Sequence, residues 1–92
     1  MFGKIQLEEF KGLTAMPQKA ASAWSSIMDG LVGVNYKPLV YCGAQVVKGL
    51  NYWFICEMNI TYVKSERKIV LLAINEFEGK YELVKESIEV IL

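Results

Sequence analysis

The chain has 92 residues, enough for one compact domain with its own hydrophobic core. Ten Lys and Arg residues balance ten Asp and Glu residues, so the sequence lacks the basic surplus that drives binding to nucleic-acid phosphates. The chain contains no histidine, which excludes Ser-His-Asp and Cys-His catalysis and every zinc site built on imidazole ligands.

The remaining reactive residues form no catalytic or metal-binding pattern. Cys42 and Cys56 lie in apolar runs, which predicts two reduced thiols that serve as small core residues. The glutamates are scattered, and a pair such as Glu86 and Glu89 is more typical of a solvated face than of a general acid and base. We therefore expect no enzymatic activity, no catalytic residue, no cofactor and no metal site.

The sequence shows no feature of secretion or of insertion into a membrane. Met1 to Lys4 lack the basic start and the apolar stretch of a signal peptide. No apolar run approaches the roughly 20 residues that cross a bilayer. We therefore expect a cytoplasmic protein whose partner is neither a membrane nor a nucleic acid.

The first expected element is a short extended segment near the N-terminus. Ile5 and Leu7 alternate with polar residues there, which favours an edge strand or an extended arm. The next element is a helix from Gln18 to Val32, which follows Pro17 and ends near two glycines. One apolar stripe runs along this helix. It consists of Ala20, Trp24, Ile27, Met28 and Leu31.

The sequence pattern after Pro38 predicts antiparallel strands joined by short turns. The expected strands span residues 39–47, 51–63, 68–77 and 81–92. In the second strand, aromatic or apolar residues occupy every other position from Tyr52 to Tyr62, which is the period of a strand. The apolar pattern changes phase between Leu83 and Ile88, which predicts a β-bulge near Lys85-Glu86.

A single amphipathic helix must bury its apolar stripe, and one face of the sheet is the available partner. We therefore predict one α+β domain over residues 1–92. In this domain one helix packs on a curved antiparallel sheet of four to five strands. The sheet is expected to wrap partly around the helix.

The connection between the first two long strands has an unusual composition, Gln45-Val46-Val47-Lys48-Gly49. It lacks the Asn-Gly or Asp-Gly pair of a common hairpin turn and places a β-branched residue near the tip. Two interpretations are open. Gly49 takes a positive φ in an ordinary hairpin, or an exposed apolar tip inserts into a groove of a partner.

This stretch resembles the first hairpin loop of the cystatins, which are reversible inhibitors of papain-like cysteine proteases. Gln-x-Val-x-Gly lies between two strands after a single helix, and Asn51-Tyr52 follows it as in the family. Gly12-Leu13-Thr14 is similar to the N-terminal glycine segment of the family. The resemblance extends from Lys11 to Phe77, and the lack of a leader and of disulfides places it nearest the intracellular stefins.

The resemblance implies non-covalent inhibition, in which an N-terminal segment and two hairpin loops block the active-site cleft of the protease. Gly12 is expected to let the arm bend close to the protease backbone. Phe77 belongs to the second loop, which here has no proline where the family usually has one. The implied protease-binding residues are Gly12, Leu13, Gln45, Val46, Val47, Lys48, Gly49 and Phe77.

A second hypothesis is a cystatin-fold protein that binds other targets or assembles with itself without inhibiting a protease. Exchange of the arm and helix between two chains is a known route to such a dimer. Under the first hypothesis, the expected partner is a papain-like cysteine protease. The expected oligomeric state is a monomer or a domain-swapped dimer.

Overall fold

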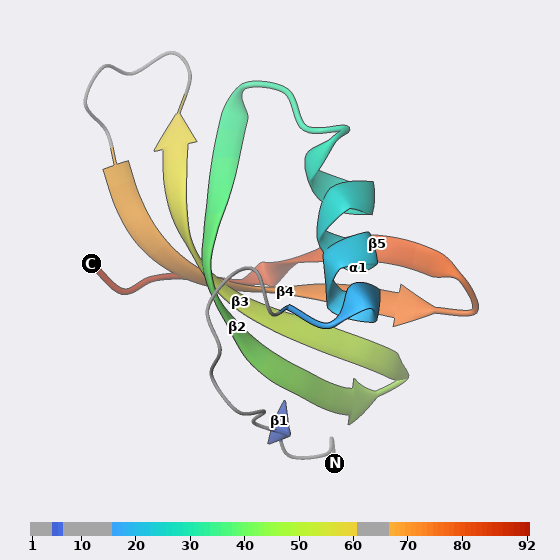
Figure 1. The fold of residues 1–92 in the computed structure, drawn as a ribbon. Coiled ribbons are helices and arrows are strands. Elements are labelled where there is room, and N and C mark those ends of the chain that lie inside the picture. Colours follow the sequence, from blue (N-terminus) through green and yellow to red (C-terminus); the bar gives the residue numbers. More distant parts are fainter. Residues whose placement is uncertain (1–4, 7–15, 61–66) are drawn as a thin grey trace.

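The computed structural model describes residues 5–6, 16–60 and 67–92 (Figure 1). The chain forms strand β1 (Ile5–Gln6), helix α1 (Gln18–Met28) and then the strands β2 (Val34–Val47), β3 (Gly49–Ile60), β4 (Arg67–Phe77) and β5 (Lys80–Val90). The five strands make one antiparallel sheet in the order β1-β2-β3-β4-β5. The α+β architecture with one helix against an antiparallel sheet is therefore as predicted.

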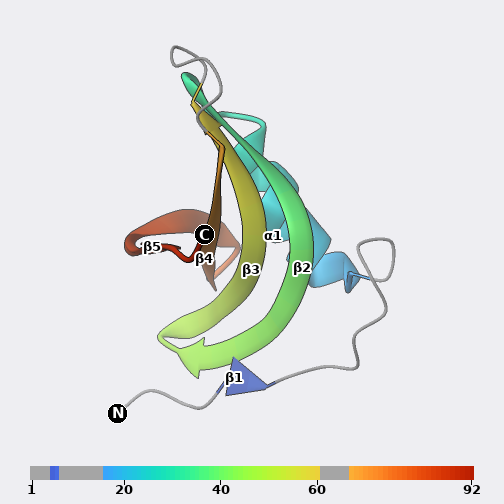
Figure 2. The same ribbon diagram turned by 90° about the vertical axis from the view of Figure 1, so that its left-hand side faces the viewer.

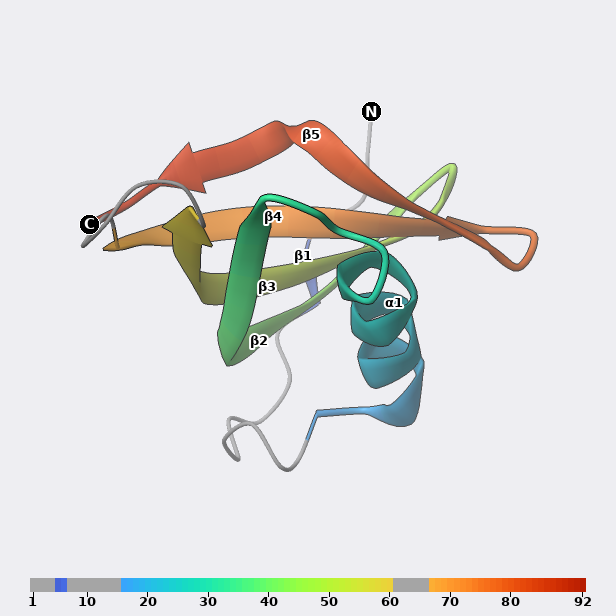
Figure 3. The same ribbon diagram turned by 90° about the horizontal axis from the view of Figure 1, so that it is seen from above.

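The sheet bends, and α1 lies inside the bend (Figures 1 and 3). Figure 2 shows the curvature of β2 and β3 most directly. Strand β2 has two shifts of register on β3, one between Pro38 and Val40 and one between Tyr41 and Gly43. Such irregularities bend a strand and increase its twist, which allows the sheet to curve over the helix.

The core lies between the helix and the facing side of the sheet. Its buried residues are Ala20, Ala23, Tyr36, Tyr52, Phe54, Cys56, Val70, Leu72 and Ile74. The predicted alternation of β3 is confirmed at Tyr52, Phe54 and Cys56, whereas Tyr62 lies outside the described residues. Trp24 packs on Phe54 with ring centroids 4.9 Å apart, a favourable aromatic contact.

Helix α1 ends at Met28, before the predicted end at Val32. The N–H groups of Gly30 and Leu31 donate to carbonyls three residues earlier, each at 3.3 Å. These tighter turns satisfy carbonyls at the end of the helix. The helix therefore ends before Gly33, the glycine that has a positive φ in this region. The predicted apolar stripe nevertheless faces the core along its whole length.

Strand β2 begins at Val34, earlier than the predicted start at Leu39. Pro38 therefore lies inside a strand and does not precede one. The described part of β1 pairs with β2 only at Ala44 and Gln45, which leaves the edge beside Pro38 without a ladder. A proline is tolerated at such an edge because its missing N–H is not needed for pairing.

The predicted bulge in β5 is confirmed. Ala73 pairs with Val84 but Leu71 pairs with Glu89, so β5 uses more residues than β4 over this interval. Ser87 fills the gap in the ladder, since its hydroxyl accepts the N–H of Ala73 at 2.8 Å and donates to the carbonyl of Val84. The side chain thus replaces backbone partners that the bulge removes.

Both cysteines are free, and Cys56 is fully buried. Burial, with a smaller effect of the neighbouring Cys42, raises the pKa of the Cys56 thiol to about 12. Burial also raises the pKa of Cys42, against the lowering effect of a backbone hydrogen bond from Ile55. Both thiols are therefore protonated near neutral pH and are poor nucleophiles.

We predict that the free energy of unfolding falls as the pH rises above about 9. The unfolded chain releases the Cys56 proton near that pH, whereas the folded chain holds it up to about 12. Deprotonation therefore favours the unfolded state within this window, by at most ~1.4 kcal/mol per pH unit for each thiol.

Urea unfolding of the wild type and of Cys56→Ala at about pH 8 and about pH 10.5 measures the effect. The variant should lose less stability between these two conditions. Burial also raises the pKa of Tyr36 and Tyr52. The variant is therefore expected to lose some stability at high pH, but less than the wild type. Equal losses in the two proteins would contradict the assignment to Cys56.

Candidate functional site

The β2–β3 hairpin has a very short tip, in which Lys48 alone separates the paired residues Val47 and Gly49. Gly49 has a φ of +84°, which glycine adopts without strain. A Cβ atom at this position would collide with the carbonyl oxygen of Glu76 on β4. The fold therefore requires this glycine, as the ordinary-hairpin interpretation expects.

The same tip exposes an apolar side chain. Val46 is 52% exposed, whereas Val47 is half-buried on the other face of the strand. Lys48 is exposed at the turn. The tip therefore has the apolar surface that the docking interpretation requires, alongside a glycine that the fold requires.

The β4–β5 hairpin ends beside this tip. Phe77 pairs with Lys80 across Glu78 and Gly79, whose φ angles are +52° and +79°. Positive φ at both central residues is the pattern of a type I′ turn. Phe77 is 37% exposed, and the Nζ of Lys48 lies 5.3 Å from the centre of its ring, within cation–π distance.

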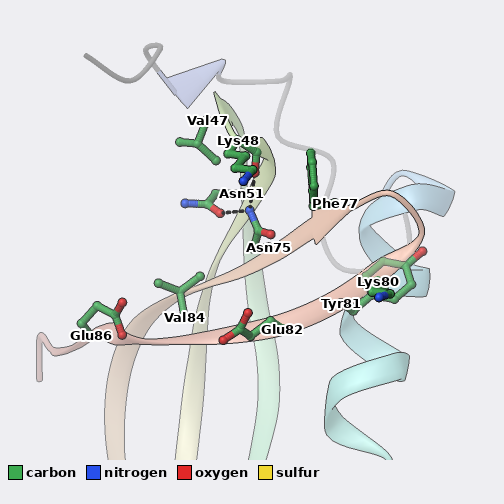
Figure 4. Close-up of a pocket in the computed structure, with 10 residues that line it drawn as sticks. All are labelled: Val47, Lys48, Asn51, Asn75, Phe77, Lys80, Tyr81, Glu82, Val84 and Glu86. Carbon is green, nitrogen blue, oxygen red and sulfur yellow. Dashed lines mark hydrogen bonds between the residues drawn. The ribbon is translucent and has the colours of Figure 1, made fainter.

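Asn75 joins the two hairpins by hydrogen bonds. Its Nδ2 donates to the backbone carbonyl of Lys48 at 3.1 Å and to Oδ1 of Asn51 at 2.9 Å (Figure 4). Asn51 and Asn75 are direct partners in the β3–β4 ladder. These bonds fix one tip relative to the other, so a partner that binds both has little conformational freedom to remove.

Gln45 lies just behind the tip, on the sheet face opposite the helix. Its Oε1 accepts a hydrogen bond from Nε1 of Trp53 at 3.1 Å. Its backbone pairs with Ile5 of β1, which places this N-terminal strand alongside the first hairpin. The start of α1 lies at the same end of the domain, since Lys19 lines a small cleft with Leu50 and Gly79.

The structure thus gathers most of the predicted binding residues at one edge of the domain. Gln45, Val46, Val47, Lys48 and Gly49 are in the first hairpin, and Phe77 is next to its tip in the second. Gly12 and Leu13, the other two predicted residues, lie outside the described part of the chain.

The sequence pattern did not predict the link through Asn75. The expected strand over residues 68–77 includes Asn75, and the structure places this residue inside β4, opposite Asn51. No local signal identifies such a pair, because the contact depends on the register between two strands.

The described residues contain no group of three or more Cys, Asp or Glu side chains placed to hold a metal ion. Within the same residues, no helix has the length and apolarity needed to cross a membrane.

Comparison with known proteins identifies no relative of this chain. No protein-family model matches the sequence, and searches of curated proteins and of solved structures give no significant match. The resemblance to the cystatins therefore rests on the hairpin motif and its position in the chain.

We predict that Gly49→Ala and Gly79→Ala destabilise the protein to different degrees. Both glycines have a φ near +80°, but a Cβ atom at Gly79 meets nothing within 4 Å. Gly79→Ala should therefore cost about 1–2 kcal/mol for the backbone conformation alone. Gly49→Ala adds the collision with Glu76 and should cost at least ~3 kcal/mol. Similar losses in urea unfolding would contradict the close approach at Gly49.

We also predict that Glu78→Asn stabilises the protein by about 1 kcal/mol, because asparagine adopts positive φ more readily than glutamate. Glu82→Asn is the matched control, since this exposed residue lies within β5 and outside the turn. The control should be neutral or slightly destabilising, because asparagine is unfavourable in strands. Urea midpoints measure both, and a destabilised Glu78→Asn would refute the turn assignment.

Proposed function

We propose that this protein is a reversible, non-covalent inhibitor of papain-like cysteine proteases, of the cystatin type and nearest to the stefins. One observation carries the proposal: two hairpin tips are held side by side at one edge and expose Val46 and Phe77. The tips enter the active-site cleft as a wedge and offer no scissile bond to the catalytic cysteine.

The position of the motif supports this function. Gln45–Gly49 forms the tip between the first two long strands, after a single helix, which is where the resemblance requires it. Strand β1, which holds only Ile5 and Gln6 of the N-terminal segment, runs beside this hairpin. A three-part wedge needs its N-terminal segment and two loops at one end of the domain.

The physical character of the edge also supports binding by shape. The valine and phenylalanine lose water contact on docking, which is worth roughly 25 cal/mol for each Å² of apolar surface removed. The Asn75 hydrogen bonds and the Lys48–Phe77 contact hold the tips in place before binding, which lowers the entropic cost.

The chemistry of the thiols supports an inhibitor that is not an enzyme. Burial raises the pKa of Cys42 and Cys56, so neither is a nucleophile near neutral pH. We propose a cytoplasmic location, which two free cysteines support because reducing compartments preserve thiols.

Titration of active papain with the purified protein tests the proposal. We expect stoichiometric inhibition that is reversed by dilution and leaves the inhibitor uncleaved, as checked by mass spectrometry. Full papain activity in a large excess of folded protein would refute it. Size-exclusion chromatography of the same sample addresses the second hypothesis, which a dimer without inhibitory activity would favour.

We predict that Val46→Asp weakens the inhibition of papain at least tenfold, or about 1.4 kcal/mol, because docking would desolvate the new carboxylate. Val90→Asp is a closely matched control. Val90 is 53% exposed, as Val46 is 52% exposed, but it lies at the far end of β5 from the tips. The control should inhibit as the wild type does. An unchanged inhibition constant for Val46→Asp would contradict the wedge.

A further inference from the structure

A groove lies on the sheet face opposite the helix, behind the hairpin tips (Figure 4). Its volume is about 790 Å³, within the range of sites that hold small ligands or short segments of chain. Val47 and Phe77 form its wall on the side of the tips, and Val84 lies opposite them on β5. The inhibitory wedge shares Val47, Lys48 and Phe77 with this groove and leaves its asparagines and its part along β5 unassigned.

Two asparagine side chains provide oriented polar groups in the groove. The carbonyl of Lys48 accepts a hydrogen bond from Asn75, which shows that the amide nitrogen of Asn75 faces it. The same nitrogen donates to Asn51, which identifies the oxygen of that second amide. The other half of each amide, Nδ2 of Asn51 and Oδ1 of Asn75, has no hydrogen-bond partner among the described residues.

These two groups match the needs of a peptide backbone. Figure 4 shows the nitrogen of Asn51 and the oxygen of Asn75 facing away from each other. One is a donor and the other an acceptor. An extended chain offers a carbonyl to the first and an N–H to the second, so backbone hydrogen bonds supply affinity independent of the sequence of the ligand.

Positive and negative side chains lie at different ends of the groove. Lys48 and Lys80 lie at the end formed by the hairpin tips, whereas Glu82 and Glu86 follow along β5. In the described part of the chain, the ion pair present joins Arg67 to Glu57 and involves none of these four residues. Lys48 contacts the ring of Phe77, and none of the four charges is neutralised by an ion pair within the described residues, so they favour a ligand with the opposite arrangement.

We propose that this groove binds an extended peptide segment of a partner protein. An apolar residue of the segment packs on Val84 and Phe77, and its backbone bonds to Asn51 and Asn75. An acidic residue lies toward Lys48 and Lys80, and basic residues lie toward the glutamates of β5. This binding requires no protease, and it shares Lys48 and Phe77 with the surface proposed for inhibition.

The test uses two blocked synthetic peptides of about seven residues, which are roughly 23 Å long when extended. Each has a glutamate at one end, a valine at the centre and lysines at the other end, and the two peptides run in opposite chain directions. They are added to the full chain labelled with nitrogen-15. We expect saturable NMR shifts of the groove residues with at least one peptide, at a Kd below about 1 mM.

Glu82→Lys should weaken the binding of that peptide at least threefold at low salt, because it reverses a charge facing the lysines. Glu89→Lys is the matched control, since it makes the same change on the same strand beyond the bulge. The control should bind as the wild type does. Absence of saturable shifts, or equal affinities of all three proteins, would overturn the proposal. Groove shifts that depend on protein concentration without peptide would indicate a second copy as the occupant and also overturn it.

Discussion

The close approach of β4 to Gly49 is the constraint on which the rest of the site depends. Because this residue has no side chain, the carbonyl of Glu76 lies where a Cβ atom would be. The approach lets the two hairpins meet at their tips, where Asn75 bonds to the backbone of Lys48 and Lys48 covers Phe77. A larger residue would separate the tips, which would then no longer present Val46 and Phe77 at one edge of the sheet. A single glycine therefore serves the turn and the packing between hairpins.

The two faces of the sheet have different roles. The inner face carries the core residues that cover the helix, such as Phe54 and Leu72. The outer face carries Gln45 with Trp53, the pair Asn51 and Asn75, and the groove. Since side chains alternate along a strand, a shift of one residue in the β3–β4 register would exchange these faces. The burial of the core therefore also positions the polar groups outside it. The proposed inhibition uses the hairpin tips, and the proposed peptide binding extends from these tips over the outer face.

Features with a local cause were predicted from the sequence. The alternation of β3 and the stripe of α1 follow from burial on one side of a regular element, and the bulge of β5 follows from a change of phase. The failures also have local causes. Pro38 indicates a strand boundary in the sequence, but the unpaired edge beside it tolerates a proline inside β2. The helix ends early because turns of tighter pitch satisfy its last carbonyls. Neither outcome is visible without knowing which neighbours each backbone group has.

The α+β class, the order of the long elements and the unusual tip from Gln45 to Gly49 can all be predicted from the sequence. These depend on periodicity and on residues close together in the chain. Only the tertiary structure decided that Phe77 lies against Lys48, that Asn51 bonds to Asn75, and that a groove lies behind them. The reason is physical: each of these contacts joins strands whose register is set by the packing of the whole core, and no short stretch of sequence contains that information.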